Sequence, residues 1–149
     1  MPELPEVETV LQGLKSNISD KTKPRELIIR FPKLRWDIPK KDLDNNIINQ
    51  EILDISRRGK YLLFKFKTGT MLIHLGMSGV LKLQALENGK IINPEKHDHV
   101  DIILDNNTFL RLNDPRRFGA VLWASGDVYQ HKLLNHLGPE PLSDDFNFD

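Results

Sequence analysis

The chain has 149 residues, and its 21 Lys and Arg balance its 21 Asp and Glu, so the formal net charge at neutral pH is zero. This balance excludes a protein that coats nucleic acid through bulk positive charge, and any DNA contact must come from a local basic patch. The absence of cysteine excludes disulfides and thiolate zinc sites, and no apolar run is long enough for a membrane span or a signal peptide. We therefore expect one domain in the cytoplasm.

The first feature of the chain is a possible reactive terminus, because residues 2–10 read PELPEVETV. Removal of Met1, the usual fate of methionine before a small residue, would expose the secondary amine of Pro2. A terminal amine has a pKa near ~8, so roughly a tenth of it is free base at neutral pH. Such an amine attacks an aldehyde carbon, for example C1 of an opened deoxyribose, and forms an iminium ion. Glu3 or Glu6 could then transfer protons. Retention of Met1 would leave the nitrogen as an unreactive amide.

The same segment also fits an ordinary amphipathic helix. Apolar side chains recur at i, i+3, i+4 and i+7, at Val7, Val10, Leu11 and Leu14. Pro5 suits the first helical turn, and acidic side chains suit the positive end of a helix dipole. Packing alone is therefore enough to explain this stretch when it is considered in isolation.

The chain beyond this helix predicts short β-strands separated by turns. The expected strands are 26–31, 47–55, 61–67, 70–75, 80–84, 100–104, 109–113 and 120–124. Hairpin signals lie at 67–69, at 105–107 and in the LGMSG stretch 75–79. This pattern predicts a mainly β protein with flanking helices, an antiparallel β-sandwich with an N-terminal helix. Trp36 and Trp123 are expected in the core or on a sheet face.

The last part of the chain predicts one more helix and a linker. Residues 127–137 have a helical pattern that ends at Gly138, and Pro139 and Pro141 follow. We expect a domain over residues 1–137 and the start of a linker over residues 138–149.

Four further stretches make the opening more specific. They are RRGKYLLF at 57–64, HLGMSG at 74–79, KHDHVD at 96–101 and DPRRFGA at 114–120. Together with PELPEVETV, and in this order, they resemble the N-terminal domain of bacterial formamidopyrimidine-DNA glycosylase, which removes oxidised purines including 8-oxoguanine. Endonuclease VIII and its relatives typically begin PEGPE, whereas this chain has Leu4 at the glycine position, which favours the formamidopyrimidine branch.

The resemblance implies a catalytic role for three residues. Pro2 would be the nucleophile at C1 of the damaged nucleotide, in a glycosylase that also cleaves abasic sites by β,δ-elimination through a Schiff base. Glu3 would be the acid and base for ring opening. Lys60 matches the family's strand lysine that contacts phosphate beside the lesion and supports catalysis.

The resemblance also implies a set of DNA-binding residues. Expelling a base from the duplex costs a few kcal/mol and leaves a gap that must be filled. Apolar side chains can wedge between bases, and arginine can meet two acceptors of the orphaned partner base. The family's gap-filling positions match Met77, Arg116 and Phe118, and its positions that hold the DNA backbone match His74 and Arg117. We also expect His97 and His99 among the DNA-binding residues.

Each of these motifs also has a plain structural explanation. LGMSG fits a tight glycine turn that leaves Met77 exposed, and DPRRFG fits a turn with Pro115 at an early position and two solvated arginines. His97 and His99 form a His-x-His pair that could bind a metal, but hydrogen-bonding roles are the stronger expectation, and the resemblance assigns no metal there. Only the joint occurrence of the motifs favours the family.

We expect no cofactor in this chain, since the family's zinc lies in a C-terminal four-cysteine finger that follows a helical domain. Without those regions we expect weak DNA binding and little glycosylase activity from a monomer. The expected partner is duplex DNA with oxidised purines or abasic sites. Two alternatives are a non-catalytic DNA-binding or lesion-sensing module of the same fold, and a β-sandwich that binds sugar or protein.

Overall fold

A computed structural model describes residues 4–126 of the chain. Pro2, Glu3, the expected helix 127–137 and the linker 138–149 lie outside the described residues. The helices are α1 (Leu4–Asn17) and α2 (Lys40–Ile47); the strands are β1 (Pro24–Ile29), β2 (Asp54–Arg58), β3 (Tyr61–Phe66), β4 (Gly69–His74), β5 (Val80–Ala85), β6 (Asp98–Leu104), β7 (Thr108–Asn113) and β8 (Ala120–Ser125).

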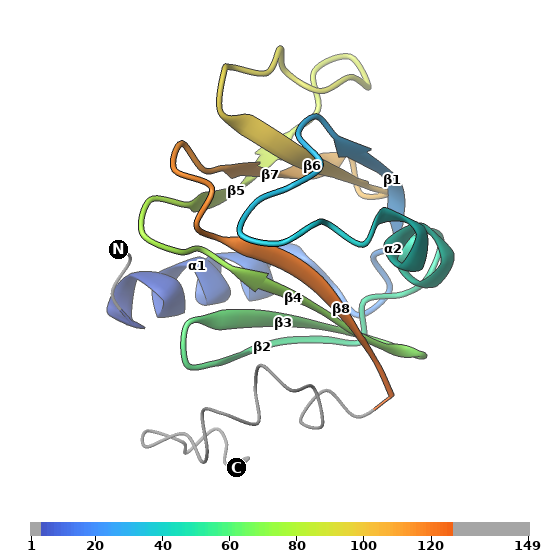
Figure 1. The fold of residues 1–149 in the computed structure, drawn as a ribbon. Helices are drawn as coiled ribbons and strands as arrows, with labels where there is room; N and C mark the ends of the chain where they lie inside the picture. The colour runs from blue at the N-terminus through green and yellow to red at the C-terminus, as the bar shows by residue number, and fades with distance from the viewer. Residues whose placement is uncertain (1–3, 127–149) are drawn as a thin grey trace.

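The strands form two antiparallel four-stranded sheets, in the orders β1-β6-β7-β5 and β2-β3-β4-β8. The sheets stack face to face, with α1 along one side and α2 beside β1 (Figure 1). This arrangement confirms the antiparallel β-sandwich with an N-terminal helix. None of the helices within residues 4–126 is long and apolar enough to cross a membrane.

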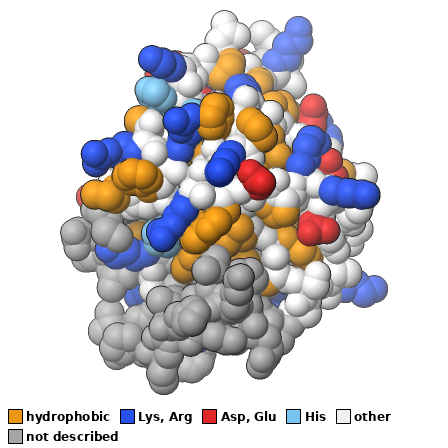
Figure 2. Space-filling view, viewed as in Figure 1, with side chains coloured by type: hydrophobic (Ala, Val, Ile, Leu, Met, Phe, Trp, Pro, Cys, Tyr) orange, Lys and Arg blue, Asp and Glu red, His pale blue; other side chains and the backbone are white. Residues whose placement is uncertain are grey.

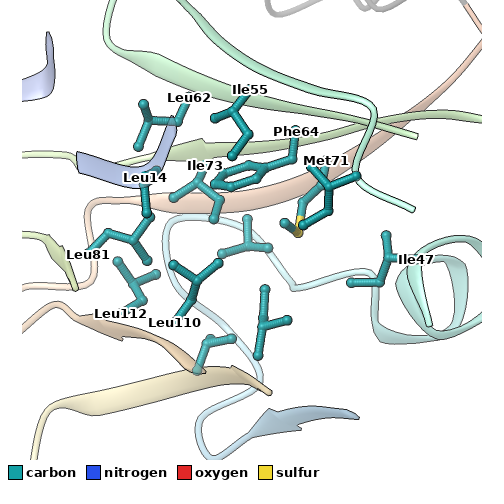
Figure 3. Close-up of a cluster of buried hydrophobic side chains, with 14 of the residues drawn as sticks. Leu14, Ile47, Ile55, Leu62, Phe64, Met71, Ile73, Leu81, Leu110 and Leu112 are labelled. Atoms are coloured by element: carbon teal, nitrogen blue, oxygen red, sulfur yellow. The ribbon is translucent and has the colours of Figure 1, made fainter. Parts of the chain in front are cut away.

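The core lies between the sheets because every second residue of each inner strand is apolar and points inward. Phe64 and Ile73 of one sheet face Leu110 and Leu112 of the other, and Leu14 of α1 closes the side (Figure 3). The expected apolar face of α1 is confirmed, since Val7, Leu11 and Leu14 are buried and Val10 packs partly against the same cluster.

The expected strand 47–55 is wrong at its start. Residues 40–47 form α2, and β2 begins only at Asp54. Leu43 and Ile47 are one helical turn apart and fully buried, so this short segment gains more by packing one helical face than by extending. The backbone N–H of Leu43 donates to the carbonyl of Pro39 at 3.0 Å, which closes the first turn.

The turns at 67–69 and 105–107 are confirmed as hairpins, joining β3 to β4 and β6 to β7. The LGMSG stretch is not a hairpin. It leads from β4 in one sheet to β5 in the other, where β5 pairs with β7. Glycine marks sharp changes of chain direction whether or not the flanking strands pair, so the sequence signal could not separate a hairpin from a crossover.

The two tryptophans have different environments. Trp123 lies on a sheet face, as expected, with its ring 6.2 Å from that of Phe66 and its Nε1 donating to Ser125 Oγ at 2.9 Å. Trp36 is not a core residue. It lies in the loop between β1 and α2 and is 36% exposed, and the Arg35 guanidinium covers its ring at 4.7 Å.

The outer face of the β1-β6-β7-β5 sheet holds a buried ion network centred on Asp101. The carboxylate accepts from Arg111 Nε at 2.9 Å and from one terminal guanidinium nitrogen at 2.8 Å, while Arg30 binds the same oxygen at 2.6 Å. Burial by itself would raise the pKa of Asp101, but the hydrogen bonds from Arg111 and Arg30 outweigh it and hold the pKa below its ordinary value. Arg111 therefore has a structural role.

Replacing Asp101 by alanine should lower the free energy of unfolding by about 3–5 kcal/mol, because the buried Arg111 would lose both hydrogen bonds to a carboxylate and keep only the longer carboxylate contact, with Asp98 at 3.8 Å. Urea unfolding at pH 7 measures the change. Asp44→Ala is the matched control, since Asp44 pairs with Lys40 at an exposed site and should change stability by at most about 0.5 kcal/mol. Equal effects of the two substitutions would contradict the prediction.

The same network predicts a pH dependence. Because the folded-state pKa of Asp101 lies below the ordinary value of 3.8, its stabilisation is complete above pH 3.8 and is lost as pH falls through the lowered folded pKa. The stability difference between the wild type and Asp101→Asn should therefore shrink in urea titrations below pH 3.8 and stay constant between pH 5 and 7.

Candidate nucleic-acid interface

Three loops meet at one end of the sandwich. They are the loop 30–39 after β1, the LGMSG loop 75–79 and the loop 114–119 between β7 and β8. The backbone N–H of Arg35 donates to the carbonyl of Gly119 at 3.0 Å, which joins the first loop to the third. A side chain carbon on Gly76, where φ is +66°, would lie 2.6 Å from the Gly119 nitrogen, so the second and third loops touch through glycine backbone.

Asp114 holds two of these loops together. It is fully buried, and its Oδ1 accepts from Ser78 Oγ at 3.0 Å and from the Arg117 backbone N–H at 3.1 Å. Its Oδ2 accepts from the Gly119 N–H at 2.9 Å. A buried carboxylate is stable when hydrogen-bond donors surround it, and these donors come from both loops. Asp114 thereby sets the position of one loop relative to the other.

The residues expected to fill a gap in duplex DNA are exposed on these two loops. Met77 is 45% exposed and Phe118 is 46% exposed, although both are large and apolar. The Arg116 guanidinium lies 5.7 Å from the Phe118 ring centroid, and its backbone N–H donates to Ser78 Oγ at 3.3 Å. Separate sequence motifs thus place an apolar side chain, an aromatic ring and a guanidinium at one end of the fold.

Arg117 lies beside them in an unusual backbone conformation. Its φ is +56°, a region that residues other than glycine rarely adopt, and its N–H donates to Asp114. Its guanidinium stacks on Phe31 at 4.3 Å from the ring centroid. These two residues line a cleft of about 690 Å³, together with Lys33, Leu34, Arg35, Arg116 and Phe118. In Figure 2, Lys and Arg side chains alternate with hydrophobic ones on the left of the visible face.

His74 and Lys60 lie next to this cluster. The His74 ring packs 4.8 Å from that of Tyr61, and its Nδ1 accepts from the Gly76 N–H at 3.1 Å. Burial is the main cause that lowers the pKa of His74, and the positive charges of Arg35 and Lys60 lower it further. Nδ1 acts as an acceptor, so the neutral ring carries its proton on Nε2 and can donate from that side.

Lys60 is in a turn and not in a strand, which corrects the expectation from the resemblance. The turn is formed by Gly59 and Lys60 between β2 and β3, with Arg58 and Tyr61 paired on either side. Gly59 has a φ of +58°, which a two-residue hairpin needs. Lys60 is therefore presented at the end of its hairpin.

The two histidines of KHDHVD differ in exposure. His99 is 7% exposed, and its Nε2 donates to the Asp114 carbonyl at 3.0 Å. His97 is partly exposed, and its carbonyl accepts from the Asp114 N–H at 3.1 Å. His99 therefore supports the loop that bears Arg116 and Arg117, and a direct DNA contact remains a prediction for both. Within residues 4–126, no group of three or more His, Asp or Glu side chains is placed to hold a metal ion.

The structure reveals site residues that the sequence reasoning missed. Asp114 and Ser78 lie inside the quoted motifs, and the Asp-Pro start of the turn was a usable signal for an aspartate that caps its own loop. Phe31, Lys33 and Arg35 belong to the run FPKLRW, which starts at the last residue of the expected strand 26–31 and alternates basic with apolar residues. Conversely, Arg57 belongs to the fold, since its Nε pairs with Glu8 of α1 at 2.8 Å.

Replacing Asp114 by alanine should lower the free energy of unfolding by about 2–4 kcal/mol, because two backbone N–H groups and the Ser78 hydroxyl would lose their acceptor. Urea unfolding gives the stability, and amide chemical shifts report on residues 115–119. Ser78→Ala is the control and should cost about 1 kcal/mol, since it removes a single hydroxyl. An Asp114→Ala protein as stable as Ser78→Ala would refute this role.

His74 should titrate below its ordinary pKa of 6.5, as measured by the ring proton shifts in NMR. Arg35→Ala should raise that pKa, because it removes a nearby positive charge that disfavours the protonated ring. Lys90→Ala, in the turn beyond β5, should leave it unchanged. Identical His74 titrations in the wild type and in Arg35→Ala would rule out this electrostatic contact.

The comparisons with known proteins agree with this geometry. A family model described as the formamidopyrimidine-DNA glycosylase N-terminal domain matches residues 1–121. A formamidopyrimidine-DNA glycosylase from Cellvibrio japonicus is 52% identical, over 98% of this chain and 52% of its own length. One from Neisseria meningitidis is 48% identical, over 98% of this chain and 52% of its own length.

Solved structures show the same likeness. The Lactococcus lactis enzyme, non-covalently bound to DNA containing an abasic site, superposes with a TM-score of 0.77 at 32% identity, covering 99% of this chain and 54% of that one. A MutM complex with carbocyclic 8-oxo-G DNA gives a TM-score of 0.77 at 32% identity, over 90% of this chain and 48% of its own. The chain spans about half the length of the curated relatives it matches. With its motifs, its sandwich and these matches in agreement, the chain belongs to the family of the formamidopyrimidine-DNA glycosylase N-terminal domain.

Proposed function

We propose that this chain is the catalytic domain of a base-excision repair enzyme, a DNA glycosylase and abasic-site lyase that acts on oxidised purines. The observation that carries the proposal is the exposure of Met77, Arg116 and Phe118 together on two loops fixed by Asp114. Large apolar side chains are normally buried, so their gathering beside arginines at one end of the fold favours a binding surface.

Met77, Arg116 and Phe118 together would form a wedge that enters the duplex. When a damaged nucleotide rotates out of the duplex, the stack loses contacts worth a few kcal/mol. Met77 and Phe118 would enter the vacated space and restore apolar contact, and Arg116 would hydrogen-bond the unpaired partner base. Rigid loops suit this task, because side chains that are already positioned lose less entropy on binding.

The proposed chemistry begins with the free amine of Pro2. Its nitrogen forms a bond to C1 of the sugar as the bond to the damaged base breaks, and the departing base leaves with its electron pair. The proline nitrogen then loses its proton and the C1–O4 bond of the sugar breaks, with the ring oxygen taking a proton from Glu3, which leaves an iminium ion. The iminium makes the C2 proton acidic, so its removal expels the 3′ phosphate, and a second elimination expels the 5′ phosphate. Glu3 is the proposed acid and base, and Lys60 and His74 are the proposed contacts to the flanking phosphates.

Because the curated relatives are about twice as long, we propose that these 149 residues alone bind DNA more weakly than a full-length relative and turn over slowly. The alternative of a lesion-sensing module shares the wedge and the phosphate contacts and lacks only the covalent step. A sugar- or protein-binding sandwich would have no use for the exposed wedge beside the basic cleft.

Borohydride trapping separates the catalytic domain from the sensing module. With the absence of Met1 confirmed by mass spectrometry, incubation with a duplex containing an abasic site and sodium borohydride should yield a covalent adduct that denaturing gels resolve. The same duplex without the abasic site is the control and should give no adduct. A processed chain that binds the abasic duplex but forms no adduct would sink the catalytic proposal and favour lesion sensing.

A further inference from the structure

The cleft of about 690 Å³ beside the wedge has one wall, loop 114–119, whose residues have the DNA roles described above, and a second wall, loop 30–39, whose residues have none. Its walls are the loop 30–39 on one side and the loop 114–119 on the other. Both walls carry basic and aromatic side chains, with Phe31, Lys33 and Arg35 on the first loop and Arg117 and Phe118 on the second. Such a lining suits a phosphodiester strand, because cations meet phosphates while rings offer flat apolar surface.

Phe31 has a specific place in this cleft. Its ring contacts two residues, with the Arg117 guanidinium 4.3 Å from its centroid and the His99 ring 5.5 Å away on a tilted plane. His99 is itself fixed by its hydrogen bond to the Asp114 carbonyl. Phe31 thus extends a chain of contacts from the buried aspartate to the charged end of Arg117.

The exposure of Phe31 shows that core packing does not explain it. The side chain is 37% exposed, and it belongs to none of the buried apolar clusters in residues 4–126. The same loop is tied to the 114–119 loop by the Arg35 to Gly119 backbone hydrogen bond. Its position is therefore set relative to Arg117, and the ring restricts a long side chain that would otherwise sample many rotamers.

We propose that Phe31 is a positioning residue for Arg117, and that the cleft they share with Lys33 and Arg35 is a subsite for the phosphate backbone of duplex DNA next to the wedge. This inference rests on the proposed function, because it assigns part of the same DNA interface. Arg117, which lines the cleft, has two constraints, a backbone held by Asp114 and a guanidinium held by Phe31, so its side chain is positioned before DNA arrives.

The test measures binding of the chain to a duplex containing a tetrahydrofuran abasic analogue, by fluorescence anisotropy at several salt concentrations. Lys33→Ala and Arg35→Ala should each weaken binding. Each should also reduce the slope of log binding constant against log salt concentration by about one, as expected for the loss of one phosphate contact. Lys90→Ala is the matched control, because Lys90 is an exposed lysine in the turn at the other end of β5 from Met77. It should leave the affinity and the slope unchanged.

Phe31 is tested with a double-mutant cycle. Phe31→Leu keeps an apolar side chain but loses the ring face, and it should weaken binding about two- to fivefold, the range of an exposed cation–π contact. Phe31→Tyr should restore wild-type affinity. In the Arg117→Ala background, Phe31→Leu should have almost no further effect, because the residue it positions is gone. Urea unfolding of each variant checks that the fold is retained.

The outcomes separate this inference from the proposed function. If the wild type binds the duplex but Lys33→Ala and Arg35→Ala behave like Lys90→Ala, the subsite is refuted and the proposed function stands. If Phe31→Leu and Arg117→Ala weaken binding additively, Phe31 does not act through Arg117. If the wild type fails to bind DNA even at low salt, the proposed function falls and the subsite falls with it.

Discussion

The hydrogen bonds to the buried carboxylate of Asp114 are the constraint on which the DNA-facing end of this molecule depends. The side chain accepts from Ser78 in one loop and from Arg117 and Gly119 in its own, while its carbonyl accepts from His99 on β6. A carboxylate can be buried only when donors surround it, so the loops must converge for the fold to form. Convergence places the wedge residues side by side.

The sandwich itself determines where those loops lie. Loops 75–79 and 114–119 each leave one sheet and enter the other, while loop 30–39 leads from β1 to α2, so none of the three closes a hairpin. The glycine contact between the second and third loops allows an approach that a side chain would block. The sheets fix the ends of these loops, which restricts where the exposed side chains can lie.

The arginines of this chain form two groups, those in structural ion pairs and those that line the cleft. Arg30 and Arg111 are tied to Asp101 on the outer face of one sheet, and Arg57 pairs with Glu8 to join α1 to β2. The guanidinium groups of Arg116 and Arg117 rest on aromatic rings and line a cleft. A chain with zero net charge can therefore still present a basic surface, because acidic side chains pair with the arginines of the fold, while Arg116 and Arg117 form no ion pair within residues 4–126.

The sequence by itself determined the fold class, the apolar face of α1 and most strands, because period-two alternation and turn residues are local properties. It also determined the family, through motifs whose residues are contiguous. Only the tertiary structure decided that residues 40–47 form a helix and that LGMSG crosses between sheets. The roles of Asp114 and Phe31 were also decided only by the tertiary structure. Each depends on a contact between residues far apart in the chain, such as Phe31 with Arg117, and no local pattern records which distant side chain will meet it.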